Sequence, residues 1–413
     1  MPDFYQHGLI TTIHDFRTSQ LEQLEGRLRK DVKINKVGLV LPVTAADMRA
    51  EPFSQIVQHL RGADYIDTIA VVLGAAPAES DYRETMQAVA PLGDKANVLW
   101  TDGPRIQAVY EQLIQAGFPL GTPGKGRSVW TAFGFLLADS DLKTFVLHDC
   151  DIVDYDRTLL ARLCLPMVHP TMDFEFCKAY YARVTDRMHG RVVRLLVAPL
   201  IQALLQTFDD DRFVRYLNSF RYPLSGEFAI TSNLARSNRI PSDWGLEVGT
   251  LAEVFRNTST KRVCQVDLCR LYEHKHQALS LDDRSSGLMK MATDILTTIF
   301  RTIASQGTVL DQCHFITLRS TYLRSAQDAI RQYNADAILN GLSFDRHAEE
   351  AAVEGFADCM ITAGDLYRSD PTGAAAIPNW ARVLTAFPDF PSDLRQIVAA
   401  DAQQLPISTQ EFG

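Results

Sequence analysis

The 413-residue sequence has no long apolar run, no block of basic residues and no pair of cysteines at CxxC spacing. A membrane-spanning helix needs about 20 consecutive apolar residues, and the most apolar stretches, such as 194–205, are shorter or interrupted by charge. Nucleic acids and anionic membrane surfaces are bound through clustered Lys and Arg. This chain has 41 such residues against 50 Asp and Glu, a formal net charge of −9, so we expect neither partner.

Cysteine is scarce and unpatterned. The seven cysteines are an odd number and form neither a disulfide framework nor a zinc motif, which favours reduced, buried thiols. The first residues contain no basic stretch followed by an apolar run, so no secretory signal is expected. Together these features predict a cytoplasmic protein. The GxSxG motif of serine hydrolases and the GxGxxG motif of dinucleotide-binding folds are also absent.

What the first half does contain is an alternation of short apolar runs and amphipathic segments. Apolar runs at 36–41, 68–73, 97–100 and 143–148 each end at Pro, Gly or Asp, and helical patterns lie between them at 51–61, 83–89, 105–115 and 128–137. This alternation predicts an α/β fold with a mainly parallel central sheet. Ligands of such sheets bind beyond the carboxyl ends of the strands.

The second half is mostly helical. Apolar residues recur at helical spacing over 282–306, and further helical patterns cover 320–333, 346–367 and 379–387. We therefore expect a C-terminal helical appendage over 281–413, which covers the cleft, pairs subunits, or does both.

Two carboxylates follow the fourth apolar run. Asp149 and Asp151 are one residue apart where that strand is expected to end, so both can face the cleft once the strand turns. They would supply the hard oxygen ligands that Mg²⁺ or Mn²⁺ prefers, and the metal would hold a diphosphate. The alternative is a strand-end turn capped by Asp.

A glycine-rich loop with a lysine precedes the helix expected from Ser128. Backbone N–H groups and the charge of Lys125 in the segment 121–127 suit contact with a phosphate. Gly126 follows this lysine where a P-loop requires Ser or Thr, so the segment is not a P-loop. A surface loop is the alternative interpretation.

Other candidate residues lie further along the chain. Arg191, between Gly190 and Val192, is suited to clamp an anionic acceptor, and Glu227 follows a Leu-Ser-Gly turn. The segment 247–249 opens a helix after a glycine. Each of these features alone is more often structural.

Two histidines complete the set. His274 and His276 occupy alternate positions, and on a strand they would share a face. Either could complete a metal site begun by the two aspartates.

Taken together, these segments resemble the glucosyl-3-phosphoglycerate synthase family, which are retaining glycosyltransferases of the GT-A fold that use nucleotide sugars. The segments 3–12, 98–105 and 124–127 are similar to its archaeal and cyanobacterial branch, and the resemblance runs in order from residue 3 to about 280. It implies a catalytic domain over 1–280, with a nucleotide-sugar half over about 1–150 and an acceptor half over about 151–280. The C-terminal region would cover the cleft or form a homodimer.

The activity implied by the resemblance is the transfer of glucose from a nucleotide-diphosphate sugar to the 2-hydroxyl of 3-phosphoglycerate, in compatible-solute biosynthesis, with Mg²⁺ or Mn²⁺. Matched by position, the donor-binding residues are Pro42, Val43, Thr44, Gly74, Lys125 and Asp149. The acceptor-binding residues are Gly190, Arg191, Val192, Glu247, Val248 and Gly249. The metal ligands are Asp149, Asp151 and His274, with His276 as the alternative, and the catalytic residues are Asp151, Arg191 and Glu227, which faces the sugar hydroxyls.

Two departures from the family pattern leave the substrates open. Residues 44–47 replace an Asn-Glu-Glu run, so UDP-, GDP- and ADP-glucose remain possible donors, and Val193 stands where some members have Thr. Mannosyl-3-phosphoglycerate and glucosylglycerate synthases are the alternatives within the fold. A non-catalytic sugar-nucleotide-binding protein and a nucleotidylyltransferase are alternatives of other classes.

Overall fold

The apolar runs of the sequence build one eight-stranded sheet, with the strand order β1-β8-β6-β7-β5-β2-β3-β4. The computed structural model describes residues 6–16, 20–208, 211–241, 245–269, 287–373 and 375–405. β7 is antiparallel to both of its neighbours, and every other pairing in this sheet is parallel. The strands are β1 (Thr11–Ile13), β2 (Lys36–Thr44), β3 (Thr68–Gly74), β4 (Ala96–Trp100), β5 (Leu142–Leu147), β6 (Phe176–Tyr180), β7 (Phe228–Thr231) and β8 (Val263–Asp267). The α/β class with a mainly parallel sheet is confirmed.

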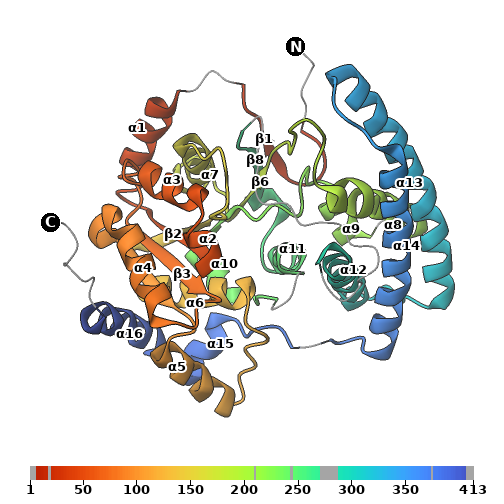
Figure 1. The fold of residues 1–413 in the computed structure, drawn as a ribbon. Helices are drawn as coiled ribbons and strands as arrows, with labels where there is room; N and C mark the ends of the chain where they lie inside the picture. The colour runs from red at the N-terminus through yellow and green to blue at the C-terminus, as the bar shows by residue number, and fades with distance from the viewer. Residues whose placement is uncertain are drawn as a thin grey trace.

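Helices connect the strands and cover both faces of the sheet (Figure 1). Those before the last strand are α1 (Leu21–Asp31), α2 (Ala45–Met48), α3 (Glu51–Leu60), α4 (Glu79–Val89), α5 (Pro104–Gln115), α6 (Lys125–Leu137), α7 (Arg157–Val168), α8 (Ala198–Thr207), α9 (Arg212–Leu217), α10 (Ser232–Ser237) and α11 (Leu246–Asn257). Short 3₁₀ segments lie at η1 (Ala90–Lys95) and η3 (Thr260–Arg262), and a π-helical turn, η2 (Val192–Val197), leads into α8.

Several predicted boundaries are wrong, and two of them concern the site. The first strand was expected to stop at Pro42, yet β2 continues to Thr44. β5 pairs with β2 only as far as Val40, so beyond that residue β2 has a neighbour on one side only and tolerates a proline. The helix expected from Ser128 begins at Lys125, which places that lysine in the first turn of α6.

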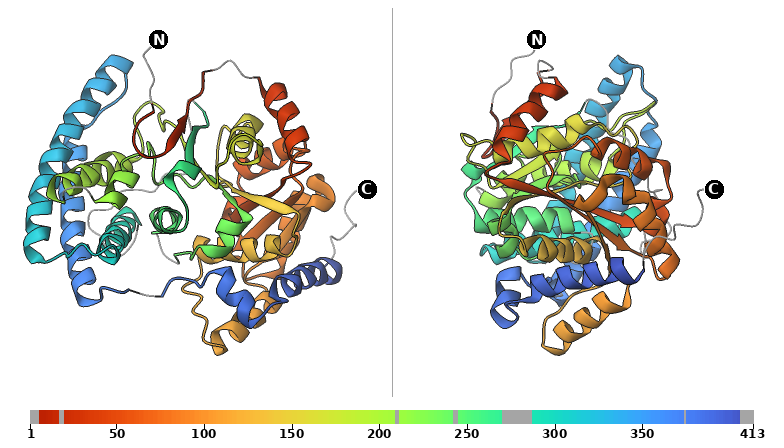
Figure 2. Two further views of the ribbon diagram at one scale, coloured as in Figure 1. Left: turned by 180° about the vertical axis from the view of Figure 1, so that it is seen from behind. Right: turned by 90° about the vertical axis from the view of Figure 1, so that its left-hand side faces the viewer.

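The region after residue 286 is helical, as predicted, but its helices pack in two places. They are α12 (Gly287–Ser305), α13 (Gln312–Asn340), α14 (Arg346–Ser369), α15 (Trp380–Ala386) and α16 (Phe390–Gln404). α12, α13 and α14 pack with one another and with α8, α11 and η2, while α15 and α16 lie against α10, α6 and β4. Figure 2 shows the two groups on opposite sides of the molecule. None of the helices in the described ranges is long and apolar enough to cross a bilayer.

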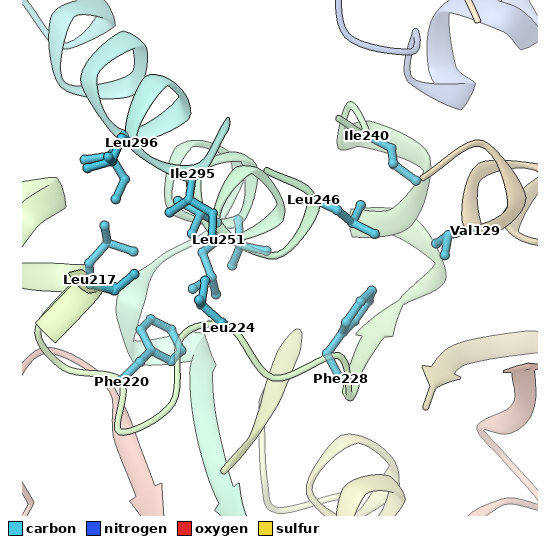
Figure 3. Packing of buried hydrophobic residues seen from close by; sticks show 14 of the residues in the cluster. Val129, Leu217, Phe220, Leu224, Phe228, Ile240, Leu246, Leu251, Ile295 and Leu296 are labelled. Carbon is cyan, nitrogen blue, oxygen red and sulfur yellow. The ribbon is translucent and has the colours of Figure 1, made fainter. Parts of the chain in front are cut away.

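Alternation along the central strands sends side chains into two hydrophobic clusters. Leu39 and Leu41 of β2 pack with α1, α3, α4 and α7, whereas Val40 packs with α5, α6 and the C-terminal helices. Figure 3 shows the second cluster where α12 meets α11, with Ile295 and Leu251 pointing toward each other. This packing holds α12 beside α11 and η2.

Candidate active site

A cavity of about 1530 Å³ lies at the carboxyl ends of β2, β3, β4 and β5. Parallel strands bring the residues that follow them to one edge of the sheet, which is why segments distant in sequence meet there. The wall also includes the start of α6, the segment 185–193 and the first turn of α12. The predicted site residues that line the cavity are Pro42, Val43, Thr44, Gly74, Lys125, Asp149, Asp151, Gly190, Arg191, Val192 and Glu247.

Of the other predicted residues, Glu227, Val248 and Gly249 do not line it. Glu227 is fully buried, and its Oε2 accepts the hydroxyl hydrogen of Tyr181 at 2.6 Å, so it lies behind the wall that Tyr181 forms. Val248 is buried in the hydrophobic core, and Gly249 packs against Pro241. His274 and His276 lie outside the described residues.

The turn that carries the two aspartates is fixed by a buried histidine. His148 is fully buried, and burial lowers its pKa to about 4, so the ring is neutral. Its Nδ1 lies 2.8 Å from the carbonyl oxygen of Asp149, which can only accept, so Nδ1 carries the hydrogen. Nε2 then accepts the hydroxyl hydrogen of Tyr155 at 3.2 Å. The bond from Nδ1 to the Asp149 carbonyl oxygen holds the start of the Asp149–Asp151 turn against the sheet.

Lys125 brings a cation to the same turn. Its Nζ lies 2.6 Å from Oδ1 of Asp149 and 3.6 Å from Oε1 of Glu247. Burial disfavours the charged amine, but these two carboxylates outweigh burial and raise the pKa of Lys125 above its ordinary value. The lysine is therefore a permanent positive charge at the first turn of α6, where backbone N–H groups also favour an anion.

The Leu-Ser-Gly-Glu segment packs directly on this pair. A methyl group in place of the Gly226 hydrogen would overlap the carboxylate of Asp149 and approach Nζ of Lys125. Behind it, the buried Lys178 of β6 donates from Nζ to the carbonyl oxygen of Ser225 at 2.6 Å. Burial lowers the pKa of Lys178 to about 8. Lys178 thus fixes the segment on one side, and on the other side Gly226 packs against Asp149 and Lys125.

Several lining residues were missed by the sequence reasoning. Thr101 and Asp102 directly follow β4, so the rule that ligands bind beyond strand ends could have found them. Asp102 Oδ2 accepts the backbone N–H of Ala76 at 2.7 Å, which fixes the loop after β3. Arg183 and Lys290 also line the cavity. They come from an irregular segment and from α12, and no motif signalled either.

Two residues of the predicted metal site, Asp149 and Asp151, lie at the cavity wall. Their carboxylate oxygens face a wall that Asp47 also lines. Burial, and then the negative charges of these three aspartates, raise the pKa of the Cys150 thiol between the pair. Within the described ranges, no group of three or more His, Cys, Asp and Glu side chains has metal-binding geometry. The third predicted protein ligand, His274 or His276, falls outside those ranges.

The sequence matches two known proteins over nearly its whole length. No family model matches the chain. Glucosyl-3-phosphoglycerate synthase of Persephonella marina is 45% identical over 401 residues, which cover 97% of this chain and 99% of that protein. The protein of the same name from Methanococcoides burtonii is 40% identical over 408 residues, covering 97% and 98%.

Solved structures of low identity share the fold. The structure of glucosyl-3-phosphoglycerate synthase from Mycobacterium tuberculosis with Mn²⁺, UDP-glucose and phosphoglyceric acid is 22% identical, with a TM-score of 0.52 over 73% of this chain and 89% of that one. Mannosyl-3-phosphoglycerate synthase from Rubrobacter xylanophilus, also 22% identical, has a TM-score of 0.55 over 73% and 83%. These likenesses confirm the GT-A fold. With two relatives at least 40% identical over nearly their whole length, the chain belongs to the glucosyl-3-phosphoglycerate synthase family of glycosyltransferases.

Proposed function

We propose that this chain transfers glucose from UDP-glucose to the 2-hydroxyl group of 3-phosphoglycerate, with retention of configuration at the sugar. The observation that carries the proposal is the meeting of Lys125, Asp149, Asp151 and Arg191 around one cavity. The names of the two full-length relatives support the reaction. The ligands of the M. tuberculosis structure support UDP-glucose as donor and phosphoglyceric acid as acceptor.

The donor side has the groups that a nucleotide diphosphate requires. Pro42, Val43, Thr44 and Gly74 would form the nucleotide pocket at the ends of β2 and β3. Lys125 and the first turn of α6 would meet the diphosphate, because both favour negative charge. Charge that builds on the leaving diphosphate in the transition state is stabilised by such fixed positive groups.

The carboxylates of Asp149 and Asp151 fit a divalent cation. They are hard oxygen donors at the cavity wall, and the lack of a side chain at Gly226 lets that residue pack closely against the Asp149 carboxylate without displacing it. When bound, Mg²⁺ or Mn²⁺ would neutralise charge on the donor diphosphate. Lys125, already 2.6 Å from Asp149, would share that task.

The acceptor side has a cationic wall. Arg191 lines the cavity together with Arg183 and Lys290, and these groups suit an acceptor with a carboxylate and a phosphate. In the reaction, the bond between C1 of glucose and the β-phosphate oxygen breaks, and the 2-hydroxyl oxygen bonds to C1 on the same face. The hydroxyl proton passes to the departing phosphate oxygen.

The position of Glu227 supports this same-face route. Its carboxylate is fully buried and is bound by Tyr181, so it is directed to the wall of the cavity rather than to the space the sugar would occupy. A carboxylate acting as a covalent nucleophile would have to reach C1. We therefore assign Glu227 to positioning of the wall through Tyr181, in place of the contact with the sugar hydroxyls that the resemblance implied.

The test is a panel of donors and acceptors. UDP-, GDP- and ADP-glucose and GDP-mannose are each combined with 3-phosphoglycerate and with glycerate, with and without Mg²⁺. We expect turnover with UDP-glucose, 3-phosphoglycerate and Mg²⁺. Preference for GDP-mannose would indicate a mannosyl-3-phosphoglycerate synthase, and preference for glycerate a glucosylglycerate synthase. Release of pyrophosphate from nucleoside triphosphate plus sugar phosphate would refute sugar transfer.

A variant pair tests the metal ligands. Asp151→Ala removes one carboxylate of the proposed site and should reduce turnover at least about 100-fold with any divalent cation. Asp154→Ala, three residues along and exposed to solvent, is the matched control and should retain wild-type activity. Full activity in the Asp151 variant would end the metal proposal.

The cytoplasm is the proposed location. Cys150, Cys164, Cys177 and Cys264 have free thiols and lie among the buried residues of the sheet and its flanking helices. Free thiols are typical of reducing compartments. The homodimer expected from the sequence stays a prediction, which sedimentation of the purified protein would decide.

A further inference from the structure

A buried carboxylate from the C-terminal helices lies behind the acceptor side of the cavity. Glu349, in the first turn of α14, is 4% exposed. Its Oε1 accepts the Nε hydrogen of Arg191 at 2.7 Å, and its Oε2 accepts a hydrogen from Arg194 at 2.9 Å. Both oxygens therefore take charge-assisted hydrogen bonds, the arrangement that a buried carboxylate requires.

Arg194 extends this contact to the main chain that carries Arg191. Its Nε donates to the carbonyl oxygen of His189 at 2.9 Å, and a terminal nitrogen donates to that of Met188 at 3.3 Å. The guanidinium also lies 4.9 Å from the ring centre of Tyr333 on α13. The turn before η2 is thus fixed on two helices of the C-terminal region.

We propose that Glu349 is a positioning residue for Arg191, so that α14 sets the orientation of the guanidinium that meets the acceptor. The inference rests on the proposed function, because it takes the ligand of Arg191 to be the anionic acceptor. Arg191 lines the cavity, and its side chain is 33% exposed. An arginine held in place before binding loses less rotamer freedom when it binds a carboxylate or phosphate.

The first experiment compares neighbouring glutamates. Glu349→Gln keeps the size of the side chain but removes the charge that holds both arginines. We expect the KM for 3-phosphoglycerate to rise about tenfold, with kcat and the KM for UDP-glucose unchanged within about twofold. Glu350→Gln is the matched control, since Glu350 is half-exposed and pairs with Arg346 on the same helix at 2.8 Å. Should Glu349→Gln fail to fold, Glu349→Asp, which keeps the charge but shortens the reach, provides the same comparison.

The opposite result has a clear meaning. If Glu349 only weakened the positive charge of the wall, its removal would lower the KM for an anionic acceptor, and that outcome would overturn the proposal. A double-mutant cycle gives a second test. In an Arg191→Ala background, Glu349→Gln should leave the acceptor KM unchanged, whereas additive effects would show that Glu349 acts independently of Arg191.

A readout without substrate separates this inference from the proposed function. Amide hydrogen exchange over residues 188–191 should be faster in Glu349→Gln than in the wild type and unchanged in Glu350→Gln. Unchanged exchange in both variants would refute the positioning role, whatever the substrate. Faster exchange in Glu349→Gln, combined with a wild-type protein that does not use 3-phosphoglycerate, would leave the positioning role in place and refute the acceptor.

Discussion

At the scale of single residues, Gly226 packs closely against Asp149 of the proposed metal pair. An added methyl group would overlap the Asp149 carboxylate and approach Nζ of Lys125. Gly226→Ala should therefore displace the carboxylate and lower kcat/KM at least about 100-fold, because small misplacements of reacting groups have effects of that size. Both displaced atoms end flexible side chains, so the unfolding free energy should change little. Wild-type kcat/KM in this variant would show that the position of Asp149 is not needed.

Lys178 is a buried cation that the fold places behind the same segment. Burial lowers its pKa to about 8 from the 10.5 of an exposed lysine, so the unfolded chain binds the additional proton between these pH values. The charged form opposes folding by about 3 kcal/mol at pH 7, and this penalty disappears as the pH rises from 8 to about 10.5. The charged groups around it are Glu247, Glu227, Lys125 and Asp149.

Lys178→Met tests this placement by removing the charge. Relative to this variant, wild-type stability should rise by up to about 3 kcal/mol between pH 7 and 10.5, measured by denaturant unfolding at several pH values. Turnover at pH 7 should fall, because the Ser225 carbonyl loses its partner. Lys143→Met is the control, since exposed Lys143 also donates to a carbonyl oxygen, that of Ser140, at 2.6 Å. A stability difference that does not vary with pH would contradict the assignment.

At the scale of elements, α15 packs against α6 through two stacked indole rings. The rings of Trp130 and Trp380 lie 4.2 Å apart, and Trp380 Nε1 donates to the carbonyl oxygen of Trp130 at 2.9 Å. A methyl group on Gly134 of α6 would overlap the buried Trp380 ring. Gly134→Ala should therefore destabilise the protein by about 1–3 kcal/mol, although alanine is the better helix former.

A second glycine provides the comparison. Gly26 of α1 has nothing within 4 Å of an added Cβ, so Gly26→Ala should stabilise by about 0.5–1 kcal/mol. The difference in sign between the two substitutions, measured by denaturant unfolding, checks the contact between α15 and α6. If both Gly134→Ala and Gly26→Ala stabilise the protein, the contact between α15 and α6 contributes little to the free energy of unfolding.

The same elements show which features a sequence can predict. The buried strands β2 to β5 were found because apolar runs ending in Gly, Pro or Asp are local signals. The division of the C-terminal helices was not, because the partner of Trp380 is Trp130, about 250 residues away. Likewise, the start of α6 at Lys125 depends on tertiary contacts that outweigh the helix-breaking effect of Gly126.

The site divides in the same way. Asp149, Asp151 and Lys125 were found because each follows a recognisable strand end or precedes a helix. Glu349 was not, since a glutamate in the first turn of a helix is ordinary in sequence and its role comes only from its partners. Motifs therefore predicted the residues at the cavity wall, and packing determined those that hold them.

At the scale of the whole molecule, a chain of net charge −9 has to bind two anionic substrates. The carboxylates of Asp47, Asp149, Asp151 and Glu247 line the cavity, and they repel a diphosphate unless a cation lies between. We therefore expect UDP-glucose to bind at least about tenfold more tightly with saturating Mg²⁺ than in EDTA. Because coupling is reciprocal, UDP-glucose must tighten Mg²⁺ binding by the same factor, and calorimetric titrations in both orders measure the two values. Equal donor affinity in EDTA would mean that Lys125 and the N-terminus of α6 offset the acidic wall without a metal.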